Sequence, residues 1–135
     1  MKDLAFEVLS GTYGIAQFDP SESIPVWSQT ASSGSFVSIS RTPEELSIIC
    51  QEALIPSDID AVRGWHCLRI AGSSDPAAEV PGIVASAVGP LADAGISVFA
   101  VATYDTDYLL VPDLNAAKAA LTAAGHHFDG GQQKL

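Results

Sequence analysis

The residues that could bind a small charged ligand lie at a predicted helix start and in two predicted hairpin turns. Gly82 precedes an apolar helical pattern, and the free backbone N–H groups of a helix N-terminus attract a carboxylate. Because glycine lacks a Cβ atom, an anion could approach the backbone of Gly82, Ile83 and Val84 closely. Glu45 and Asp107 could hold the cationic end of the same ligand. A glycine required only by its turn, and two solvated turn acids, explain these residues equally well.

Polar residues beside the two acids could add hydrogen bonds to a ligand. Thr103 and Tyr104 lie where the first strand of one predicted hairpin meets its turn, and each carries a hydroxyl that can donate. Arg41 and Thr42 hold the corresponding places in the other hairpin. Arg41 could instead form an ion pair at the surface or at an interface, and such a pair contributes little to stability when it is exposed.

Sequence patterns for catalysis, metal binding and phosphate binding are absent. His66 and Cys67 are neighbours on a predicted strand, so their side chains point to opposite faces and cannot form a nucleophile–base pair. His126 and His127 fail as a chelating pair for the same reason. The sequence contains neither Gly-x-Ser-x-Gly nor a P-loop. We therefore expect a protein that is not an enzyme, without a metal or a cofactor.

Charge and composition narrow the classes of partner. The 135 residues carry a formal net charge of -10, with 16 acidic and 6 basic side chains. Nucleic acid and anionic membrane surfaces require a basic footprint, so neither is an expected partner. No apolar segment approaches the roughly 18 residues of a membrane span, and charges interrupt the N-terminal stretch, unlike a secretory signal. Cys50 and Cys67 are expected to be buried free thiols in a cytoplasmic protein, with a disulfide or a metal site as the alternative.

Hydrophobic periodicity predicts several short strands. Residues 4–9 and 13–18 read as two strands that could form a hairpin across Ser-Gly-Thr. Residues 35–40 and 62–71 also alternate apolar and polar side chains, and residues 95–112 read as strand, polar turn and strand. One-turn helices are expected near residues 24–29 and 52–55.

Two longer helices complete the expected elements. Residues 81–94 repeat apolar side chains every four positions and end at Gly95, although Pro90 should kink or split this helix. Asp113 is the expected N-cap of a second helix over residues 114–124, and residues 126–128 read as a last strand. From residue 62 onward the order is strand, helix, strand, strand, helix, strand, which is the split βαβ arrangement.

Residues 37–49 and 99–111 share one pattern at a constant offset of 62 residues. In each copy, alternating apolar residues precede a polar turn, an acid and an apolar run. This alignment makes Glu45 and Asp107 equivalent. It also overrules the helix start that residues 42–45 suggest by themselves, so we predict a turn there. The repeat indicates two similar halves, of which the first has only shortened helices.

The repeated stretch and its flanking residues also carry a family resemblance. The matching residues are 41–49, 82–83, 90–99, 103–112, 119–121 and 125–126. They resemble tandem ACT-domain proteins, the group of the aspartate-kinase regulatory domains and the CASTOR-type arginine sensors. The resemblance implies an α+β fold of two ferredoxin-like (βαββαβ) ACT units side by side, with antiparallel sheets and helices on one face. The units are expected at residues 1–61, with shortened helices, and 62–135.

The resemblance further implies a non-catalytic regulatory or sensor protein that binds a small molecule, usually an amino acid, at the interface of two ACT units. The ligand-binding residues implied in this way are Arg41, Thr42, Glu45, Leu46, Ser47, Gly82, Ile83, Val84, Thr103, Tyr104 and Asp107. Ala100 and Ala102 stand where polar residues would be more informative, so the ligand's side chain is not readable.

An interaction module that only dimerises, without a working ligand site, is the alternative of a different class. Exposed strand edges in such sheets invite pairing between chains. A homodimer therefore fits both the sensor and the interaction module, and we expect one.

Overall fold

The computed structural model describes residues 3–29, 35–72 and 82–129. The chain divides into two compact units. The central unit is Leu9–Trp65, and the terminal unit combines Met1–Val8 with His66–Leu135. The sequence-based division placed the first residues of the chain with the N-terminal half. In the structure they belong with the C-terminal half, because the first strand adds to its sheet.

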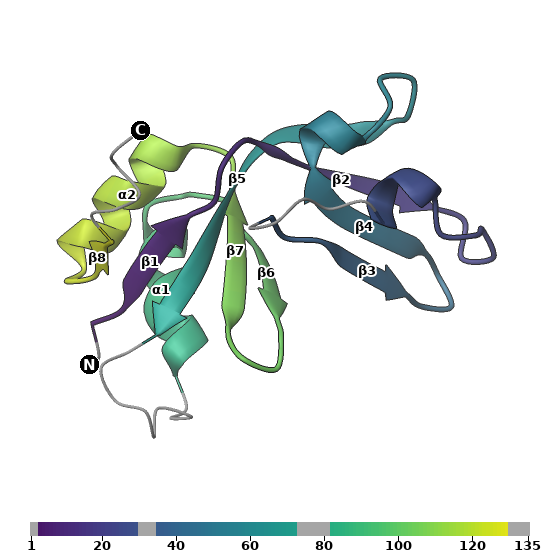
Figure 1. Cartoon of the computed structure of the whole chain (residues 1–135). Helices are drawn as coiled ribbons and strands as arrows, with labels where there is room; N and C mark the ends of the chain where they lie inside the picture. The colour runs from purple at the N-terminus through teal and green to yellow at the C-terminus, as the bar shows by residue number, and fades with distance from the viewer. Residues whose placement is uncertain (1–2, 30–34, 73–81, 130–135) are drawn as a thin grey trace. The chain divides into compact units, whose positions relative to one another are not determined.

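The terminal unit contains a five-stranded sheet with two helices. The sheet has the order β6 (Phe99–Ala102), β7 (Asp107–Val111), β5 (Ala61–Gly72), β1 (Ala5–Val8) and β8 (His127–Phe128). All neighbours are antiparallel except β1 and β8. With helices α1 (Ile83–Asp93) and α2 (Leu114–Ala123), the chain order β5-α1-β6-β7-α2-β8 is the ferredoxin-like order (Figure 1). Strand β1 is inserted between the first and last strands of that pattern.

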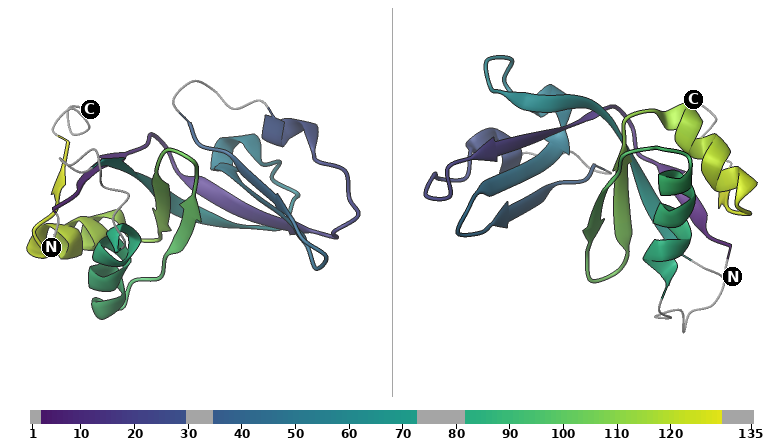
Figure 2. Two further views of the ribbon diagram at one scale, coloured as in Figure 1. Left: turned by 90° about the horizontal axis from the view of Figure 1, so that it is seen from below. Right: turned by 180° about the vertical axis from the view of Figure 1, so that it is seen from behind.

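Both helices cover one face of this sheet (Figure 2). Leu68 and Ile70 alternate on β5, and Leu109 and Val111 alternate on β7, so each pair points to a single face. Together with Leu4 and Phe6 from the start of the chain, they form one buried cluster with the inner residues of the helices, which are Ala87, Leu91, Ala117 and Leu121. The Asp113 carboxylate accepts a hydrogen bond from the Ala116 N–H at 3.0 Å, as its predicted N-cap role requires.

Pro90 lies inside α1, and the helix runs on through it. A proline has no N–H to donate to the carbonyl four residues earlier, which here belongs to Ser86. His126 Nε2 lies 2.8 Å from that carbonyl oxygen, and His126 Nδ1 accepts the Leu4 N–H at 2.9 Å. The tautomer with hydrogen on Nε2 satisfies both groups. The buried imidazole thereby links Leu4 to α1. Because α1 is continuous from Ile83 to Asp93, the prediction that Pro90 splits the helix is wrong, while a kink stays a prediction.

The central unit repeats the ferredoxin-like order with shortened helices. Its sheet is antiparallel throughout, in the order β3 (Ser38–Arg41), β4 (Leu46–Gln51), β2 (Tyr13–Phe18) and the first part of β5. The 3-10 helices η1 (Val26–Gln29) and η2 (Glu52–Leu54) stand at the places of the two helices. They contribute Trp27 and Leu54 to a core built on Leu46, Ile48, Cys50 and Ile55. The predicted one-turn helices and the predicted turn at residues 42–45 are confirmed.

The predicted hairpin between the first two strands is wrong. Strand β1 pairs with β5 and β8, whereas β2 pairs with β4 and β5. The two strands are neighbours in sequence but belong to different units. Their alternating patterns identify them as strands, while their partners are supplied by residues far along the chain.

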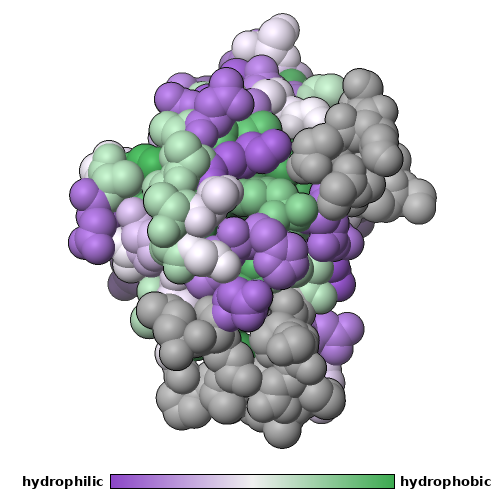
Figure 3. Space-filling model, turned by 90° about the vertical axis from the view of Figure 1, so that its left-hand side faces the viewer, coloured by the Kyte–Doolittle hydropathy of each residue, from purple (hydrophilic) through white to green (hydrophobic). Residues whose placement is uncertain are grey.

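The surface of the terminal unit over α2 and β8 mixes hydrophilic and weakly hydrophobic residues (Figure 3). This follows from the alanine-rich sequence of α2, in which Ala117 and Leu121 are buried and most other positions are partly or fully exposed. Among the described residues, no helix combines the length and apolar character that crossing a membrane requires.

Candidate functional site

Helix α1 begins at Gly82, which adopts a left-handed backbone conformation with φ of 98°. A Cβ atom added to Gly82 would meet nothing within 4 Å, so the backbone conformation rather than a close approach requires glycine here. Gly82 provides no side-chain cap, and its carbonyl accepts the Ser86 N–H at 2.8 Å. The first turn of α1 therefore presents N–H groups that a side chain of the N-cap residue does not satisfy. Pro81 lies outside the described residues.

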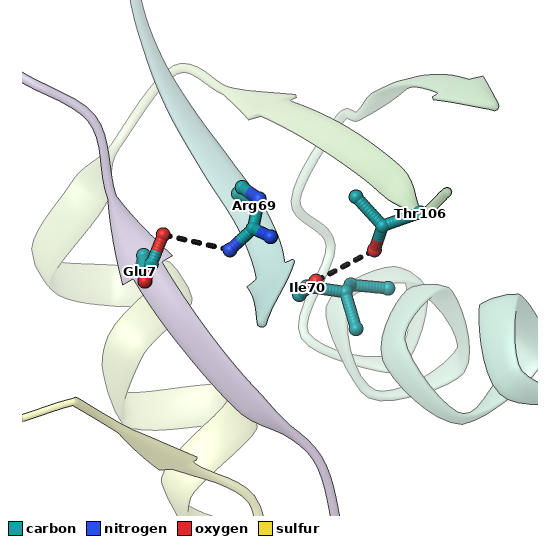
Figure 4. A network of polar contacts seen from close by, with 4 residues as sticks. All are labelled: Glu7, Arg69, Ile70 and Thr106. Carbon is teal, nitrogen blue, oxygen red and sulfur yellow. Dashed lines mark hydrogen bonds and ion pairs between the residues drawn. The ribbon is translucent and has the colours of Figure 1, made fainter. Parts of the chain in front are cut away.

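The β6–β7 turn lies at the same end of the terminal unit as the start of α1 (Figure 1). Strands β5 and β7 are antiparallel, so the end of β5, which leads to α1, meets the beginning of β7. Thr106 Oγ1 donates to the Ile70 carbonyl at 2.6 Å and fixes the turn against β5 (Figure 4). The structure thus brings two predicted groups to one end of the unit. They are Gly82, Ile83 and Val84, and Thr103, Tyr104 and Asp107.

The turn itself is closed by hydrogen bonds between two threonines. The Thr103 N–H and Oγ1 both donate to the Thr106 carbonyl at 2.8 Å, and the Thr106 N–H donates to Thr103 Oγ1 at 3.2 Å. Thr103 therefore has a structural task within the turn. Tyr104 is fully exposed at the tip, and Asp107 is half-buried. Because side chains alternate along a strand, Asp107 shares the helix-covered face of the sheet with Leu109 and Val111.

The predicted site residues of the central unit lie at the β3–β4 turn. Arg41 Nη1 donates to the carbonyl oxygens of Pro20 and Glu22, the latter at 2.9 Å. Glu45 accepts a hydrogen bond from Gln17 Nε2 at 3.1 Å. The Leu46 side chain is completely buried in the core, so only its backbone is left for a ligand, while Ser47 is half-buried. The Arg41 guanidinium thus fastens a loop of its own unit.

The strand ladders correct the alignment of the two hairpins by one residue. Ser38 pairs with Ile49 in the first hairpin, and Phe99 pairs with Leu110 in the second, each 61 residues later. The turns agree with this shift. The Thr42 N–H donates to the carbonyl three residues on, as the Thr103 N–H does. The offset of 62 is therefore wrong.

This shift changes the partners of the two acids. Thr106 corresponds to Glu45, and Asp107 corresponds to the buried Leu46. Since a shift of one residue moves a side chain to the other face of a sheet, Glu45 and Asp107 point to opposite faces of their hairpins. They are not equivalent, and of the two only Asp107 lies on its unit's helix-covered face.

Sequence reasoning missed several polar contacts. Thr106 was overlooked. In both turns a threonine, Thr42 or Thr103, bonds to the residue three positions later, and this shared spacing could have revealed Thr106. The ion pair between Arg69 and Glu7, with Nη1 and Oε1 2.9 Å apart, joins β5 to β1 across two strands whose pairing the sequence did not predict (Figure 4).

Nucleophilic and metal chemistry find no support among the described residues. Cys50 and Cys67 are free and buried, as predicted. Burial raises the pKa of the Cys50 thiol to about 11 and that of Cys67 to about 12, so neither carries an appreciable thiolate fraction near neutral pH. The described part of the chain holds no group of three or more His, Cys, Asp or Glu residues arranged to bind a metal ion.

The family model of the ACT domain matches residues 60–122 of the chain. The chain contains an ACT domain, which spans these residues. A second family model, described as an N-terminal domain, matches residues 11–58. The ACT match runs from β5 to α2 and therefore includes the start of α1 and the turn with Thr103, Tyr104 and Asp107.

Two solved structures are similar to this chain over nearly its whole length. The crystal structure of protein Atu0741 from Agobacterium tumefaciens is 41% identical, with a TM-score of 0.85 over 96% of this chain and 94% of that one. The ligand-free regulatory subunit of aspartate kinase from Thermus thermophilus is 15% identical, with a TM-score of 0.54 over 92% of this chain and 94% of that one. The second similarity shows the α+β fold alone.

A curated relative is the cytosolic arginine sensor for mTORC1 subunit 1 of Homo sapiens. It is 31% identical over an alignment of 98 positions, which covers 66% of this chain and 30% of the sensor. The match thus spans less than a third of the relative's length.

Proposed function

We propose that the chain is a non-catalytic regulatory module that binds a free amino acid at the α1 end of its ACT domain. The observation that carries the proposal is the arrangement at that end. The uncapped first turn of α1 and the half-buried Asp107 lie at the same end of the terminal unit, on the side of the sheet that the helices cover. Similarity to a cytosolic arginine sensor supports this class of function and a cytoplasmic location.

In this proposal the two charged groups of the ligand meet two different parts of the unit. The ligand carboxylate accepts the N–H groups of Ile83 and Val84, where the helix dipole favours negative charge. The ligand ammonium pairs with the Asp107 carboxylate. Thr103 and Tyr104 border the site. The participation of Arg41, Thr42, Glu45, Leu46 and Ser47, and a ligand held between two ACT units, stay predictions.

A thermal-shift screen of the full chain against the twenty amino acids tests the proposal, starting with arginine. A ligand at 100 times its Kd stabilises a folded protein by about 2.7 kcal/mol, which corresponds to a shift of a few degrees at this size. Asp107→Asn should weaken the binding by roughly tenfold or more, because it removes one partner of a charge pair. Asp105→Asn is the matched control, since Asp105 is an exposed acid in the same turn. Equal affinities for the two variants, or an unchanged midpoint with every amino acid, would contradict the proposal.

Glu45→Gln tests the predicted contribution of the central unit with the same measurement. If the β3–β4 turn takes part in binding, this variant should weaken the affinity, because it removes a carboxylate from the predicted site. Glu44→Gln serves as its control, because Glu44 is an exposed acid of the same turn.

The alternative function, a dimerising interaction module, is favoured by one observation. Strand β6 is an edge of the terminal unit's sheet, and Phe99 on this strand is 41% exposed. Edge strands with exposed apolar residues pair readily with other chains. The N–H of Ala100 points away from β7, because the hydrogen-bonded pairs of this hairpin are those of Thr103 and Val101. Sedimentation of the wild type and of Ala100→Pro, which blocks pairing along this edge of β6, would separate a dimer formed there from a monomer or from a dimer formed elsewhere.

A further inference from the structure

An open pocket of about 450 Å³ lies at the end of the central unit opposite the β3–β4 turn. It is lined by Thr12, Glu52, Ala53, Ile55, Ser57 and Arg63. Three of these residues belong to η2 or follow it directly, where the unit has a single helical turn in place of a full helix. The pocket therefore lies beside η2, the single turn that stands at the place of a full helix. Its volume falls within the range of about 300–1,000 Å³ typical of small-ligand sites.

Arg63 enters the pocket with its guanidinium held in place. Its Nη2 atom donates to the carbonyl oxygens of Pro56 and Ile59, at 3.0 and 2.8 Å. Its Nη1 and Nε groups make no hydrogen bond to a described residue. Ile55 of the lining packs closely on Gly14, because a Cβ atom on that glycine would lie 2.6 Å from Ile55 Cδ1. A fixed guanidinium with free N–H groups is suited to binding a carboxylate through two parallel hydrogen bonds.

Glu52 provides the opposite charge in the same pocket. Its Oε1 atom accepts hydrogen bonds from Thr12 Oγ1 and from the Gly64 N–H, both at 2.9 Å. The Glu52 N–H in turn donates to the Thr12 carbonyl at 2.8 Å. These bonds fix the carboxylate and leave Oε2 without a partner among the described residues. A carboxylate oxygen keeps its capacity to accept a hydrogen bond from an ammonium group.

We propose that this pocket is a second site, separate from the α1 end of the ACT domain, and that it binds a free α-amino acid as a zwitterion. The ligand carboxylate lies against Arg63, and its ammonium lies against Glu52. A simple anion is disfavoured by Glu52 and by the chain's net charge of -10, and a simple cation is disfavoured by Arg63. A ligand carrying both charges satisfies both side chains, and the apolar atoms of Ala53 and Ile55 face the rest of it.

Amide NMR of the isotope-labelled full chain, titrated with each of the twenty amino acids, tests this inference. Glycine is the smallest probe, and acetate and methylammonium each carry one half of its charge pair. At least one amino acid should shift the Gly64 amide and the Arg63 Nε–H signals saturably at concentrations up to about 10 mM, the range of weak binding. Acetate and methylammonium should shift these signals less at the same concentration.

Two near-isosteric variants define the roles of the charges. Glu52→Gln and Arg63→Gln should each weaken the binding by roughly tenfold, and Arg63→Lys should have an intermediate affinity because it keeps the charge and loses the fork. Glu44 is an exposed acid at the other end of the unit, so Glu44→Gln should bind the amino acid as the wild type does. Arg63→Gln also removes two hydrogen bonds to the loop, so this variant could fail to fold. In that event the affinity of Glu52→Gln decides whether the pocket binds the ligand.

The outcomes separate this inference from the proposed function. Signals of Ile83 and Val84 report the α1 end, and those of Gly64 and Arg63 report the pocket. If no amino acid shifts the Gly64 and Arg63 signals saturably, or if Glu52→Gln binds as the wild type does, Arg63 only fastens its loop and the second site is wrong. That result leaves binding at the α1 end unaffected.

Discussion

The central and terminal units follow the same order of strands and helices, yet they cover their sheets differently. In the terminal unit, α1 and α2 supply buried residues to the core. In the central unit, the single turns η1 and η2 supply Trp27 and Leu54 instead. The Trp27 ring packs 6.2 Å from that of Phe18. The comparison shows that one large side chain from a short turn can cover part of a sheet face. The open pocket of the central unit lies beside η2, the shorter of its two single turns.

The largest expected difference between the units concerns Phe6, which the terminal unit takes from the start of the chain. Phe6 is completely buried, so Phe6→Ala should lower the free energy of unfolding of the terminal unit by about 3–5 kcal/mol. Phe18→Ala should cost less, since Phe18 is only half-buried in the central unit. Hydrogen exchange at Leu68 and Ile48 during urea titration measures the two units separately. Equal losses for both variants would contradict the difference expected from the burial of the two rings.

The hydrogen bonds of His126 to Leu4 and Ser86 belong to the terminal unit, and a substitution tests how much they contribute to its stability. His126→Ala leaves the Leu4 N–H and the Ser86 carbonyl unsatisfied, and each buried orphan costs about 1–3 kcal/mol. We expect a total loss of roughly 2–4 kcal/mol in chemical denaturation. The exposed neighbour His127 is the control, and His127→Ala should change stability little. Adding Pro90→Ala should recover part of the loss by returning an N–H to the Ser86 carbonyl; a purely additive double variant would remove that explanation.

The two buried thiols predict a loss of stability at high pH in both units. Burial raises the pKa of Cys50 to about 11 and that of Cys67 to about 12, from an ordinary value of 9.0. A thiol whose pKa is raised in the folded state contributes its full stabilisation when the pH is below its pKa in the unfolded state. That contribution is lost as the pH rises toward its pKa in the folded state. Unfolding free energy should therefore fall by roughly 1 kcal/mol per thiol for the first pH unit above 9. Cys67→Ala should make this fall shallower; an unchanged slope would mean that Cys67 ionises freely in the fold.

The smallest expected effect separates the two hairpin turns. Thr106→Val removes the hydrogen bond to the Ile70 carbonyl and should cost about 1 kcal/mol. Glu45, its counterpart by strand register, makes an exposed bond to Gln17, so Glu45→Gln should change stability by a few tenths of that amount. Thermal unfolding of the two variants provides the comparison. A larger loss for Glu45→Gln would contradict the small contribution expected of the exposed bond to Gln17.

Local features of the fold could be predicted from the sequence because their signals lie within a few residues. Asp113 caps α2, and Cys50 and Cys67 are buried, each as its surroundings indicated. The turn at residues 42–45 was predicted only through the comparison with the second hairpin, because its own residues suggest a helix start. The alternating runs also marked the strands. Periodicity indicated the order of elements from residue 62 onward, and the internal repeat indicated the shortened helices of the first copy.

Features that depend on distant partners could not be predicted in the same way. Nothing local to β1 shows that it pairs with β5 rather than with β2. The acid before each apolar run favoured an offset of 62, whereas backbone pairing sets it at 61. Thr12, Glu52 and Arg63 meet in one pocket although they are far apart in the chain. Such arrangements arise from strand pairing, which a single pass along the sequence does not reveal.

The placement of β1 also determines the order in which we expect the two units to fold. During synthesis the first strand leaves the ribosome long before β8, and the bond between Leu4 and His126 joins residues 122 apart. The central unit contains all of its strands by residue 65 and can fold while the rest is being made. The terminal unit must wait for nearly the whole chain, and closing so long a loop slows folding. We therefore expect the half with the full helices to be the last to form.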